Sequence, residues 1–239
     1  MRALILNSGM GKRMGSLTRQ QPKCMVELRG GETILSRQID SLQEAGIHEI
    51  IMTTGYMGGR LEQYCRSLGR NVNFTFVPNN RYDETNYIYS IYLAREYLQA
   101  DVLLLHGDLV FEKSVLQELL RCRNSCMTIS TVLPLPTKDF RAVVENDFVV
   151  KVGVEFFNNA YAAQPFYKLN WMDWSVWLEQ IVAYCKDGQV GVYAEEALND
   201  VTERCLIKPL DIEDRLCAEV DDLEDLGRVR ERLSSIDNN

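Results

Sequence analysis

A short apolar strand runs directly into a glycine-containing loop at the start of this chain, and this junction limits the fold more than any other segment. Residues 2–6 are predicted to form a buried strand, Gly9 and Gly11 lie in the loop, and the basic residues Arg13 and Lys23 follow. Glycines let a backbone approach phosphate oxygens closely. An arginine can bind two oxygens at once, and a lysine adds a compact charge. The pattern therefore predicts a loop that wraps a nucleoside triphosphate in an enzyme.

Two other phosphate-binding loops do not fit this segment. The dinucleotide fingerprint needs a third glycine at a set spacing, which is missing after Gly9 and Gly11. The P-loop needs four spacer residues before its Gly-Lys pair, and Lys12 is not placed in that way. What distinguishes the loop is the combination of glycines, adjacent basic residues and the later pair Pro22-Lys23.

Apolar runs and helical patterns alternate through the first half of the chain. This rhythm predicts βαβ units and a mostly parallel sheet covered by helices on both faces. We expect right-handed crossovers and a ligand site beyond the carboxyl ends of the strands. The expected strands are 2–6, 49–54, 73–77, 101–105 and 127–132, and the expected helices are 33–45, 58–68, 87–98 and 114–121.

The pattern changes after residue 135, although no linker separates the two halves. A β-hairpin is expected around residues 145–147. We predict a single α/β domain with a Rossmann-like mixed sheet, in which residues 1–135 form the nucleotide-binding core and residues 136–239 the acceptor-binding region. The further elements expected in the second half are strands 162–169 and 206–211 and helices 171–187, 195–203 and 222–234.

Composition excludes several classes of protein. The formal net charge is −8, which argues against nucleic acid as a partner because such proteins usually present a basic face. No segment approaches the roughly 20 apolar residues of a membrane span, so no membrane insertion is expected. The seven cysteines contain no C-x-x-C pair, which favours reduced thiols in a cytoplasmic protein. With two histidines in the chain, a histidine-based metal site or catalytic triad is poorly supported.

The N-terminal motif L-N-S-G-M-G-K-R-M-(x)3-T-(x)3-P-K resembles that of the nucleotidyltransferases that make sugar nucleotides and CDP-alcohols. The usual pattern is L-x-A-G-x-G-x-R-[ML]-x-x-x-T-x-x-x-P-K, and Ser8 stands where alanine is common. The resemblance implies the nucleotide-diphospho-sugar transferase fold and catalytic roles for Arg13 and Lys23. It also implies that the nucleotide is bound by Leu6, Asn7, Ser8, Gly9, Met10, Gly11 and Lys12.

Two carboxylates are candidate metal ligands. Asp108 follows an apolar strand, at the sheet edge where active sites collect. Residues 218–226 resemble the E-[IV]-D-x-x-E-D-L element of the same family, which implies that Asp221 completes the metal site. A Mg²⁺ ion binds one or two carboxylates together with phosphate oxygens. We therefore expect Mg²⁺ as cofactor, with Asp222 as the better candidate to cap the last helix.

Residues 78–94 resemble the N-P-x-Y-x-x-T-N-N-I-x-S-L-x-x-A segment of the phosphocholine cytidylyltransferase branch, with Tyr87 in place of the second asparagine. The resemblance implies CTP as the nucleotide and roles for Asn86 and Ser90 in positioning it. Either Thr85 or Asn86 is a natural cap for the following helix.

The second half is expected to hold the acceptor. Aromatic residues are frequent in this half, and an aromatic cage with a carboxylate would suit an acceptor that carries an ammonium group. Trp174 and Trp177, however, are spaced as on one face of a helix and are expected in the hydrophobic core. Arg141 matches the first of two lysines typical of the family hairpin, whereas Val154 stands at the second, so the acceptor is left open. The candidate acceptor-binding residues are Arg141, Tyr161, Trp171, Tyr193, Glu195 and Glu196, with either glutamate facing the acceptor.

These observations predict a CTP-dependent cytidylyltransferase. It would join CMP to a small phosphorylated amine or alcohol, or to a phosphonate, of the phosphocholine, phosphoethanolamine or 2-aminoethylphosphonate type, and release pyrophosphate. A hexose-1-phosphate nucleotidyltransferase and a non-catalytic nucleotide-binding regulator are the alternatives. The intact Lys23, Asp108 and Asp221 argue against the regulator. A homodimer stays open as the assembly.

Overall fold

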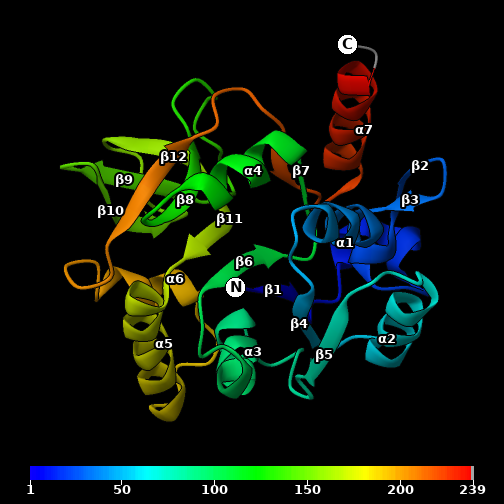
Figure 1. Ribbon diagram of the computed structural model, residues 1–239, viewed down its shortest axis with the longest axis horizontal. Helices are drawn as coiled ribbons and strands as arrows, with labels where there is room; N and C mark the ends of the chain where they lie inside the picture. The colour runs from blue at the N-terminus through cyan, green and yellow to red at the C-terminus, as the bar shows by residue number, and fades with distance from the viewer. Residues whose placement is uncertain (238–239) are drawn as a thin grey trace.

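The computed structural model describes residues 1–237 as a nine-stranded mixed sheet with helices on both faces (Figure 1). The main strand order is β10-β9-β11-β6-β1-β4-β5, and β8 and β12 continue the sheet beside β11. The expected fold class is confirmed. The strands are β1 (Arg2–Asn7), β4 (Glu49–Thr54), β5 (Asn73–Pro78), β6 (Val102–His106), β8 (Ser125–Ser130), β9 (Arg141–Glu145), β10 (Phe148–Gly153), β11 (Ala160–Leu169) and β12 (Ile207–Asp211).

Helices and two small two-stranded sheets complete the fold. The small sheets pair β2 (Glu27–Arg29) with β3 (Glu32–Thr33), and β7 (Leu109–Phe111) with β13 (Cys217–Glu219). The α-helices are α1 (Ile34–Glu44), α2 (Gly58–Ser67), α3 (Tyr87–Ala94), α4 (Lys113–Arg121), α5 (Trp171–Lys186), α6 (Ala194–Asn199) and α7 (Leu223–Asp237). Short 3-10 helices cover Lys12–Thr18, Lys23–Met25 and Arg95–Tyr97.

Strand β1 lies at the centre of the sheet, parallel to both β4 and β6. Its side chains alternate between faces. Ala3 and Ile5 pack with α1, α2 and α4, whereas Leu4 and Leu6 pack with α3, α5 and α6. Burial on both faces explains why β1 is apolar without interruption. Because β1 and β6 are parallel neighbours, the loops that follow them leave the same edge of the sheet side by side.

Most helix boundaries follow local capping. Thr33 forms a capping box with Ser36 at the start of α1, and Asn86 caps α3 by accepting a hydrogen bond from the Tyr87 amide at 2.7 Å. Asp222 accepts hydrogen bonds from the amides of Glu224 and Asp225 at the start of α7, as expected. Helices 87–98 and 195–203 were predicted too long, because α3 gives way to a 3-10 turn and α6 ends at Asn199.

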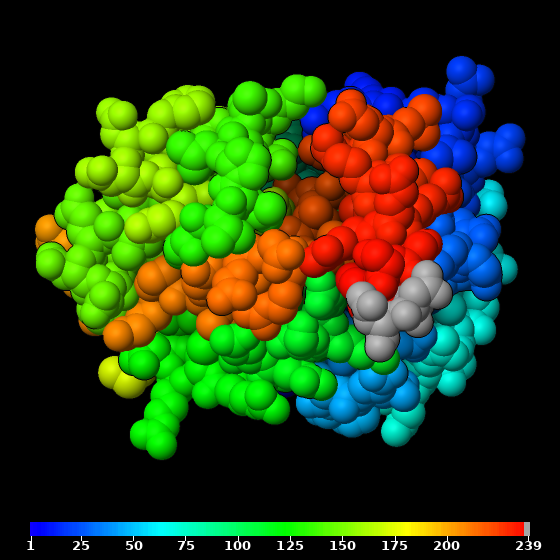
Figure 2. Space-filling model, turned by 90° about the horizontal axis from the view of Figure 1, so that it is seen from above, coloured from blue at the N-terminus to red at the C-terminus, as the bar shows by residue number. Residues whose placement is uncertain are grey.

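The second half extends the same sheet, because β11 pairs antiparallel with β6. The expected hairpin is confirmed, with Asn146 and Asp147 at positive φ in its turn. In Figure 2, helix α7 (red) lies against N-terminal segments (blue), and its Leu226 and Val229 pack with Met14. None of the described helices is long and apolar enough to cross a bilayer.

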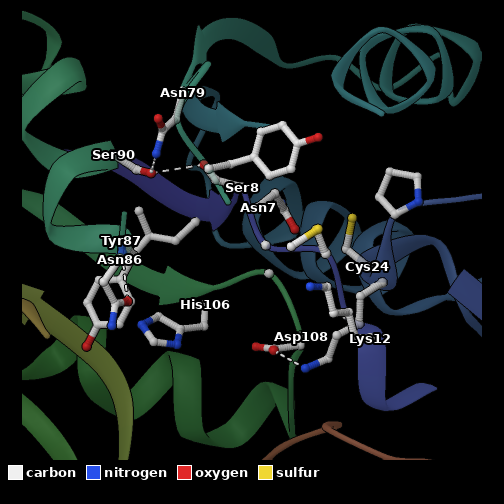
Figure 3. A pocket seen from close by; sticks show the side chains of 18 of the residues that line it. Asn7, Ser8, Lys12, Cys24, Asn79, Asn86, Tyr87, Ser90, His106 and Asp108 are labelled. Atoms are coloured by element: carbon white, nitrogen blue, oxygen red, sulfur yellow. Dashed lines mark hydrogen bonds and ion pairs between the residues drawn. The ribbon is translucent and has the colours of Figure 1, made fainter. Parts of the chain in front are cut away.

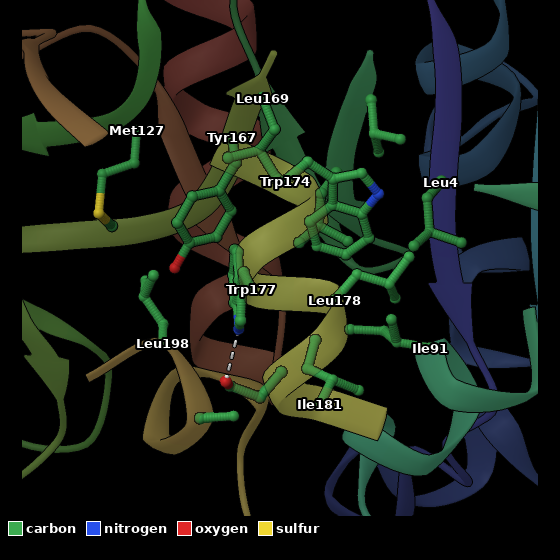
Figure 4. Close-up of a cluster of buried hydrophobic side chains, with 14 of the residues drawn as sticks. Leu4, Ile91, Met127, Tyr167, Leu169, Trp174, Trp177, Leu178, Ile181 and Leu198 are labelled. Carbon is green, nitrogen blue, oxygen red and sulfur yellow. Dashed lines mark hydrogen bonds between the residues drawn. The ribbon is translucent and has the colours of Figure 1, made fainter. Parts of the chain in front are cut away.

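The two tryptophans at helical spacing on α5 belong to the core, as predicted (Figure 4). Trp174 and Trp177 are completely buried and meet edge to face at 5.5 Å between ring centroids. The indole Nε1 of Trp174 donates to the Leu98 carbonyl, and that of Trp177 donates to the Ala194 carbonyl, both at 2.9 Å. These bonds satisfy the polar end of each buried ring and join α5 to the segments around α3 and α6.

Candidate active site

A pocket of about 420 Å³ opens where the first strand and β6 end (Figure 3). This is the edge of the sheet at which α/β proteins bind ligands. The pocket brings together the four predicted catalytic residues and all of the predicted nucleotide-binding residues. Its lining includes Leu6, Asn7, Ser8, Gly9, Met10, Gly11, Lys12, Arg13, Lys23, Asn86, Ser90, Asp108 and Asp221.

The glycine loop is shaped by a close approach to Lys23. Gly11 has φ of 60°, and a Cβ atom there would lie 2.9 Å from the Lys23 Cβ. Thr18 donates a hydrogen bond to the Gly11 carbonyl at 2.9 Å, which closes the loop onto the following turn. Only glycine combines this backbone conformation with so little space. The loop therefore packs directly against Lys23 at the pocket.

A second close approach joins the ends of β1 and β6. The Asn7 side chain covers Gly107 so tightly that a Cβ on Gly107 would lie 1.7 Å from Asn7 Oδ1. The Asn7 amide nitrogen Nδ2 is buried and has no hydrogen-bond partner among the described residues. A buried donor of this kind is usually satisfied by a ligand or water. Asn7 can therefore donate to a bound nucleotide.

The charged centre of the pocket is a cation held by two carboxylates. The ammonium group of Lys23 contacts Asp108 and lies 2.5 Å from Asp221 Oδ1, and Arg13 Nη2 lies 2.7 Å from Asp221 Oδ2. Burial alone would lower the pKa of Lys23, but the attraction of Asp108 and Asp221 outweighs it and raises that pKa. Burial opposes ionisation of Asp108, yet Lys23 holds its pKa below the usual value. Lys23 and Asp108 are therefore both ionised at neutral pH.

The same carboxylates are suited to a metal ion. Asp108 Oδ1 is buried without a hydrogen-bond partner among the described residues. Candidate ligand atoms of His106, Asp108 and Glu219 lie within 4.8 Å of one another, and so do those of Asp139, Glu219 and Asp221. Mostly oxygen donors around an unsatisfied carboxylate fit Mg²⁺ better than a soft metal.

Three of these residues were not predicted from the sequence. Glu219 is the first residue of the E-[IV]-D element, so the motif itself could have pointed to it. His106 stands at the last position of β6, where side chains face the pocket. Asp139 lies in a loop with no motif, and no sequence signal identifies it.

Ser8 and Ser90 are linked by a buried hydrogen-bond chain beneath the pocket. Asn79 donates to Ser90, and Ser90 donates to Ser8, both at 3.0 Å (Figure 3). Asn79 also donates to Thr85 at 3.0 Å. These bonds fix α3 against the end of β1. Thus Ser8, which differs from the alanine common in the family, has a partner for its hydroxyl.

A second buried network lies under the other wall of the pocket. Glu195 accepts hydrogen bonds from the hydroxyls of Tyr87 and Tyr167, the latter at 2.9 Å. Burial, reinforced by Glu195, raises the pKa of both tyrosines well above the usual value. They stay neutral donors and stabilise the buried Glu195 carboxylate. The network joins α3, α6 and β11.

We expect Tyr87→Phe to destabilise the fold by about 1–3 kcal/mol, because it leaves the buried Glu195 carboxylate with one tyrosine donor instead of two. Urea denaturation measures the change in free energy of unfolding. Tyr97→Phe is the matched control, since Tyr97 is exposed and its ring hydroxyl lies outside this network. Equal stability of the two variants would contradict the role assigned to the network.

His106 is another buried ionisable side chain that lines the pocket next to Tyr87. Its Nδ1 lies 2.7 Å from Glu219 Oε1, and its ring meets Tyr87 edge to face at 4.6 Å. Burial lowers the pKa of His106, but Glu219 outweighs it and raises that pKa to about 8. Burial raises the pKa of Glu219 despite the attraction of His106.

The predicted acceptor residues divide into those near the pocket and those away from it. Tyr193 lies 5.9 Å from Tyr87 and 5.2 Å from Phe140, measured between ring centroids. It therefore packs against Tyr87, which lines the pocket, but it is not itself a lining residue. Glu195 is buried beneath Tyr87, whereas Glu196 is exposed and accepts a hydrogen bond from the Tyr193 amide at 3.3 Å as a helix cap. Tyr161, which is 37% exposed on β11, is not among the pocket-lining residues.

Two of the acceptor residues expected from sequence do not fit that role. Arg141 is completely buried, and its two terminal nitrogens donate to the carbonyls of Val154 and Pro136. Its guanidinium group is therefore occupied by the hairpin and the preceding loop. The Trp171 amide donates to Asp101 Oδ1 at 2.8 Å, just before β6 begins, whereas the pocket lies where β6 ends.

Comparison with known proteins agrees with this geometry. Residues 3–140 match the family model for the MobA-like NTP transferase domain. The CTP:phosphoglutamine cytidylyltransferase of Campylobacter jejuni is 28% identical over 177 residues, which are 67% of this chain and 68% of that protein. The choline-phosphate cytidylyltransferase of Streptococcus pneumoniae is 29% identical over 51% of each chain.

A third relative, the CMP-5'-(3-aminopropyl)phosphonate synthase of Streptomyces rubellomurinus, is 32% identical over 49% of this chain and 19% of its own length. Apart from the Campylobacter protein, these relatives are thus matched over about half of their length or less.

Solved structures share the fold over nearly the whole chain. The inositol-1-phosphate CTP transferase from T. maritima superposes with a TM-score of 0.79 at 22% identity, over 98% of this chain and 95% of that one. The CTP:phosphocholine cytidylyltransferase of Streptococcus pneumoniae gives 0.74 at 20% identity, over 97% and 98%. At these identities, the likeness establishes the fold.

Proposed function

The chain belongs to the MobA-like NTP transferase family, and on this basis we propose that it is a CTP-dependent cytidylyltransferase. It would transfer CMP to a small acceptor that carries a phosphate or phosphonate group and release pyrophosphate. The observation that carries the proposal is Lys23 held between Asp108 and Asp221 beside the glycine loop. The named activities of the relatives support CTP, and they differ in the acceptor.

The mechanism needs positioning and charge stabilisation more than covalent chemistry. An oxygen of the acceptor's phosphate or phosphonate attacks the α-phosphorus of CTP, a P–O bond forms, and the bond to the departing pyrophosphate breaks. Arg13 and Lys23 offset the charge that builds on the transferring and leaving groups. The attacking oxygen is already anionic, so no general base is required.

Asp108 and Asp221 would hold Mg²⁺, which neutralises phosphate charge when it is bound. The loop from Leu6 to Lys12 would bind the triphosphate, and Asn86 and Ser90 would position the nucleotide from α3. Residues 1–135 would then act as the nucleotide half. Residues 136–239 would bind the acceptor beside Tyr193, and Glu195 would support that wall from beneath.

We expect purified protein with Mg²⁺ to release pyrophosphate from CTP at least about tenfold faster than from UTP, GTP or dTTP, because base-specific hydrogen bonds discriminate strongly. The assay uses a panel of phosphocholine, phosphoethanolamine, 2-aminoethylphosphonate, an amide-bearing phosphate and glucose 1-phosphate. Omission of the acceptor is the control for hydrolysis. Preference for dTTP or UTP with the hexose phosphate would replace this proposal with a hexose-1-phosphate nucleotidyltransferase.

A further inference from the structure

We propose that His106 is a further acceptor-contacting residue, whose Nε2 donates a hydrogen bond to the acceptor's phosphate or phosphonate group while Glu219 holds the ring. This inference rests on the proposed cytidylyltransferase function. It assigns a role to a side chain that lies at the end of a central strand, two residues before Asp108.

The orientation of the His106 ring is fixed from two sides. Glu219 contacts Nδ1 at 2.7 Å, and β13 holds Glu219 in place because it pairs with Leu109 of β7. The ring of Tyr87 packs against the imidazole at 66° between the ring planes. With Nδ1–H donated to Glu219, Nε2 also carries a proton in the imidazolium form, which the Glu219 carboxylate stabilises. A ring held by a carboxylate and an aromatic neighbour presents that N–H in one direction.

The second ring nitrogen of His106 lacks a partner. His106 lines the cavity between Tyr87 and Asp108 (Figure 3). Its Nε2 is buried, and no described residue forms a hydrogen bond with it. A buried polar atom in this state costs stability unless a ligand or water satisfies it. The Nε2 atom of His106 is therefore available for a hydrogen bond with a ligand.

The Tyr87 hydroxyl and the terminal nitrogens of Arg141 already have internal partners. The Tyr87 hydroxyl donates to Glu195, and both terminal nitrogens of Arg141 donate to carbonyls. Lys23 and Arg13 contact the two aspartates. An anionic acceptor group bound beside Asp108 would therefore find the unpartnered Nε2 of His106, two residues away in the chain, as a donor.

Two substitutions separate this role from a structural one. In His106→Asn, the amide nitrogen can replace Nδ1 and keep the Glu219 bond, but nothing replaces Nε2. In His106→Gln, the amide nitrogen reaches the Nε2 position instead. We expect Asn to raise the KM for the acceptor about tenfold or more, with the KM for CTP within twofold of the original value, and Gln to retain most activity. The reverse ranking would mean that pairing with Glu219 is the only role, and would overturn the inference.

A binding measurement tests the contact without the reaction. The chain has two histidines, so the imidazole NMR signals of His106 and the exposed His48 are assigned with His48→Gln, which is also the control. Methylphosphonate should shift the His106 signal with saturation and leave His48 unchanged. A shift caused by MgCl₂ alone, with none from methylphosphonate, would make the ring a metal ligand and overturn the inference. A methylphosphonate shift in a protein that releases no pyrophosphate would contradict the proposed function and leave this contact standing.

Discussion

Asp108→Asn is expected to lower the rate of CTP-dependent pyrophosphate release by about 10²–10³-fold. The substitution keeps the size of the side chain and removes its charge. Asp108 provides the buried Oδ1 that has no partner, and it also contacts Lys23. A neutral amide binds Mg²⁺ weakly. The fold should survive, because Lys23 still has Asp221 at 2.5 Å.

Asp147→Asn is the matched control for Asp108→Asn. It makes the same change of charge in the exposed turn between β9 and β10, where φ is 65° and asparagine is well tolerated. We expect turnover close to that of the unmodified chain. Activity titrated with MgCl₂ should need a higher concentration in Asp108→Asn alone. Unchanged turnover and unchanged Mg²⁺ dependence in that variant would refute the metal assignment.

The parts of the site that could be predicted are those fixed by strand ends. Parallel strands β1 and β6 are neighbours, so a loop after one and Asp108 after the other must meet at the same sheet edge. Local sequence patterns define both strands, and the motif resemblance added Asp221 from the far end of the chain. These residues do line one pocket.

Arg141 shows why the acceptor side could not be predicted. On β9 it lies between Gly153 of β10 and Ala162 of β11, inside the sheet. Successive strand residues face opposite sides, so a shift of one position would reverse its surroundings. The amino-acid composition of β9 does not reveal how it is aligned with its neighbours β10 and β11. Arg141 was therefore assigned to a ligand, although both of its terminal nitrogens donate to backbone carbonyls.

His106, Asp139 and Glu219 escaped prediction for a related reason. They come from three separate segments and are brought together by the pairing of β13 with β7 and by the loop before β9. The E-[IV]-D motif could have pointed to Glu219 itself, but no spacing in the sequence encodes its meeting with His106 or with Asp139. Trp171 shows the opposite error. It is close in sequence to other aromatic residues and was therefore expected at the acceptor site, but it lies at the start of β6, away from the pocket.

Lys23→Met is expected to abolish most of the activity and to destabilise the fold by about 3 kcal/mol at neutral pH, because it leaves the Asp108 carboxylate without its cation, whereas Asp221 keeps its contact with Arg13. In the unmodified chain the pKa of Asp108 is lowered, so its stabilising effect is present above the unfolded value of about 3.9. The raised pKa of Lys23 makes its contribution complete below about 10.4. Between pH 5 and 8 this contribution is therefore constant.

In the Lys23→Met variant, by contrast, the free energy of unfolding should decrease as the pH rises. With Lys23 removed, Asp108 stays buried near another carboxylate without its cation, so its folded pKa rises above the unfolded one and stability falls as pH rises through the new value. Urea denaturation at pH 5 and pH 8 should show a larger loss at pH 8, partly restored by MgCl₂. Lys113→Met is the control, because the exposed Lys113–Glu44 pair contributes less than about 1 kcal/mol. An equal loss at both pH values, insensitive to MgCl₂, would mean that Lys23 supports packing and that the two carboxylates do not form a cation site.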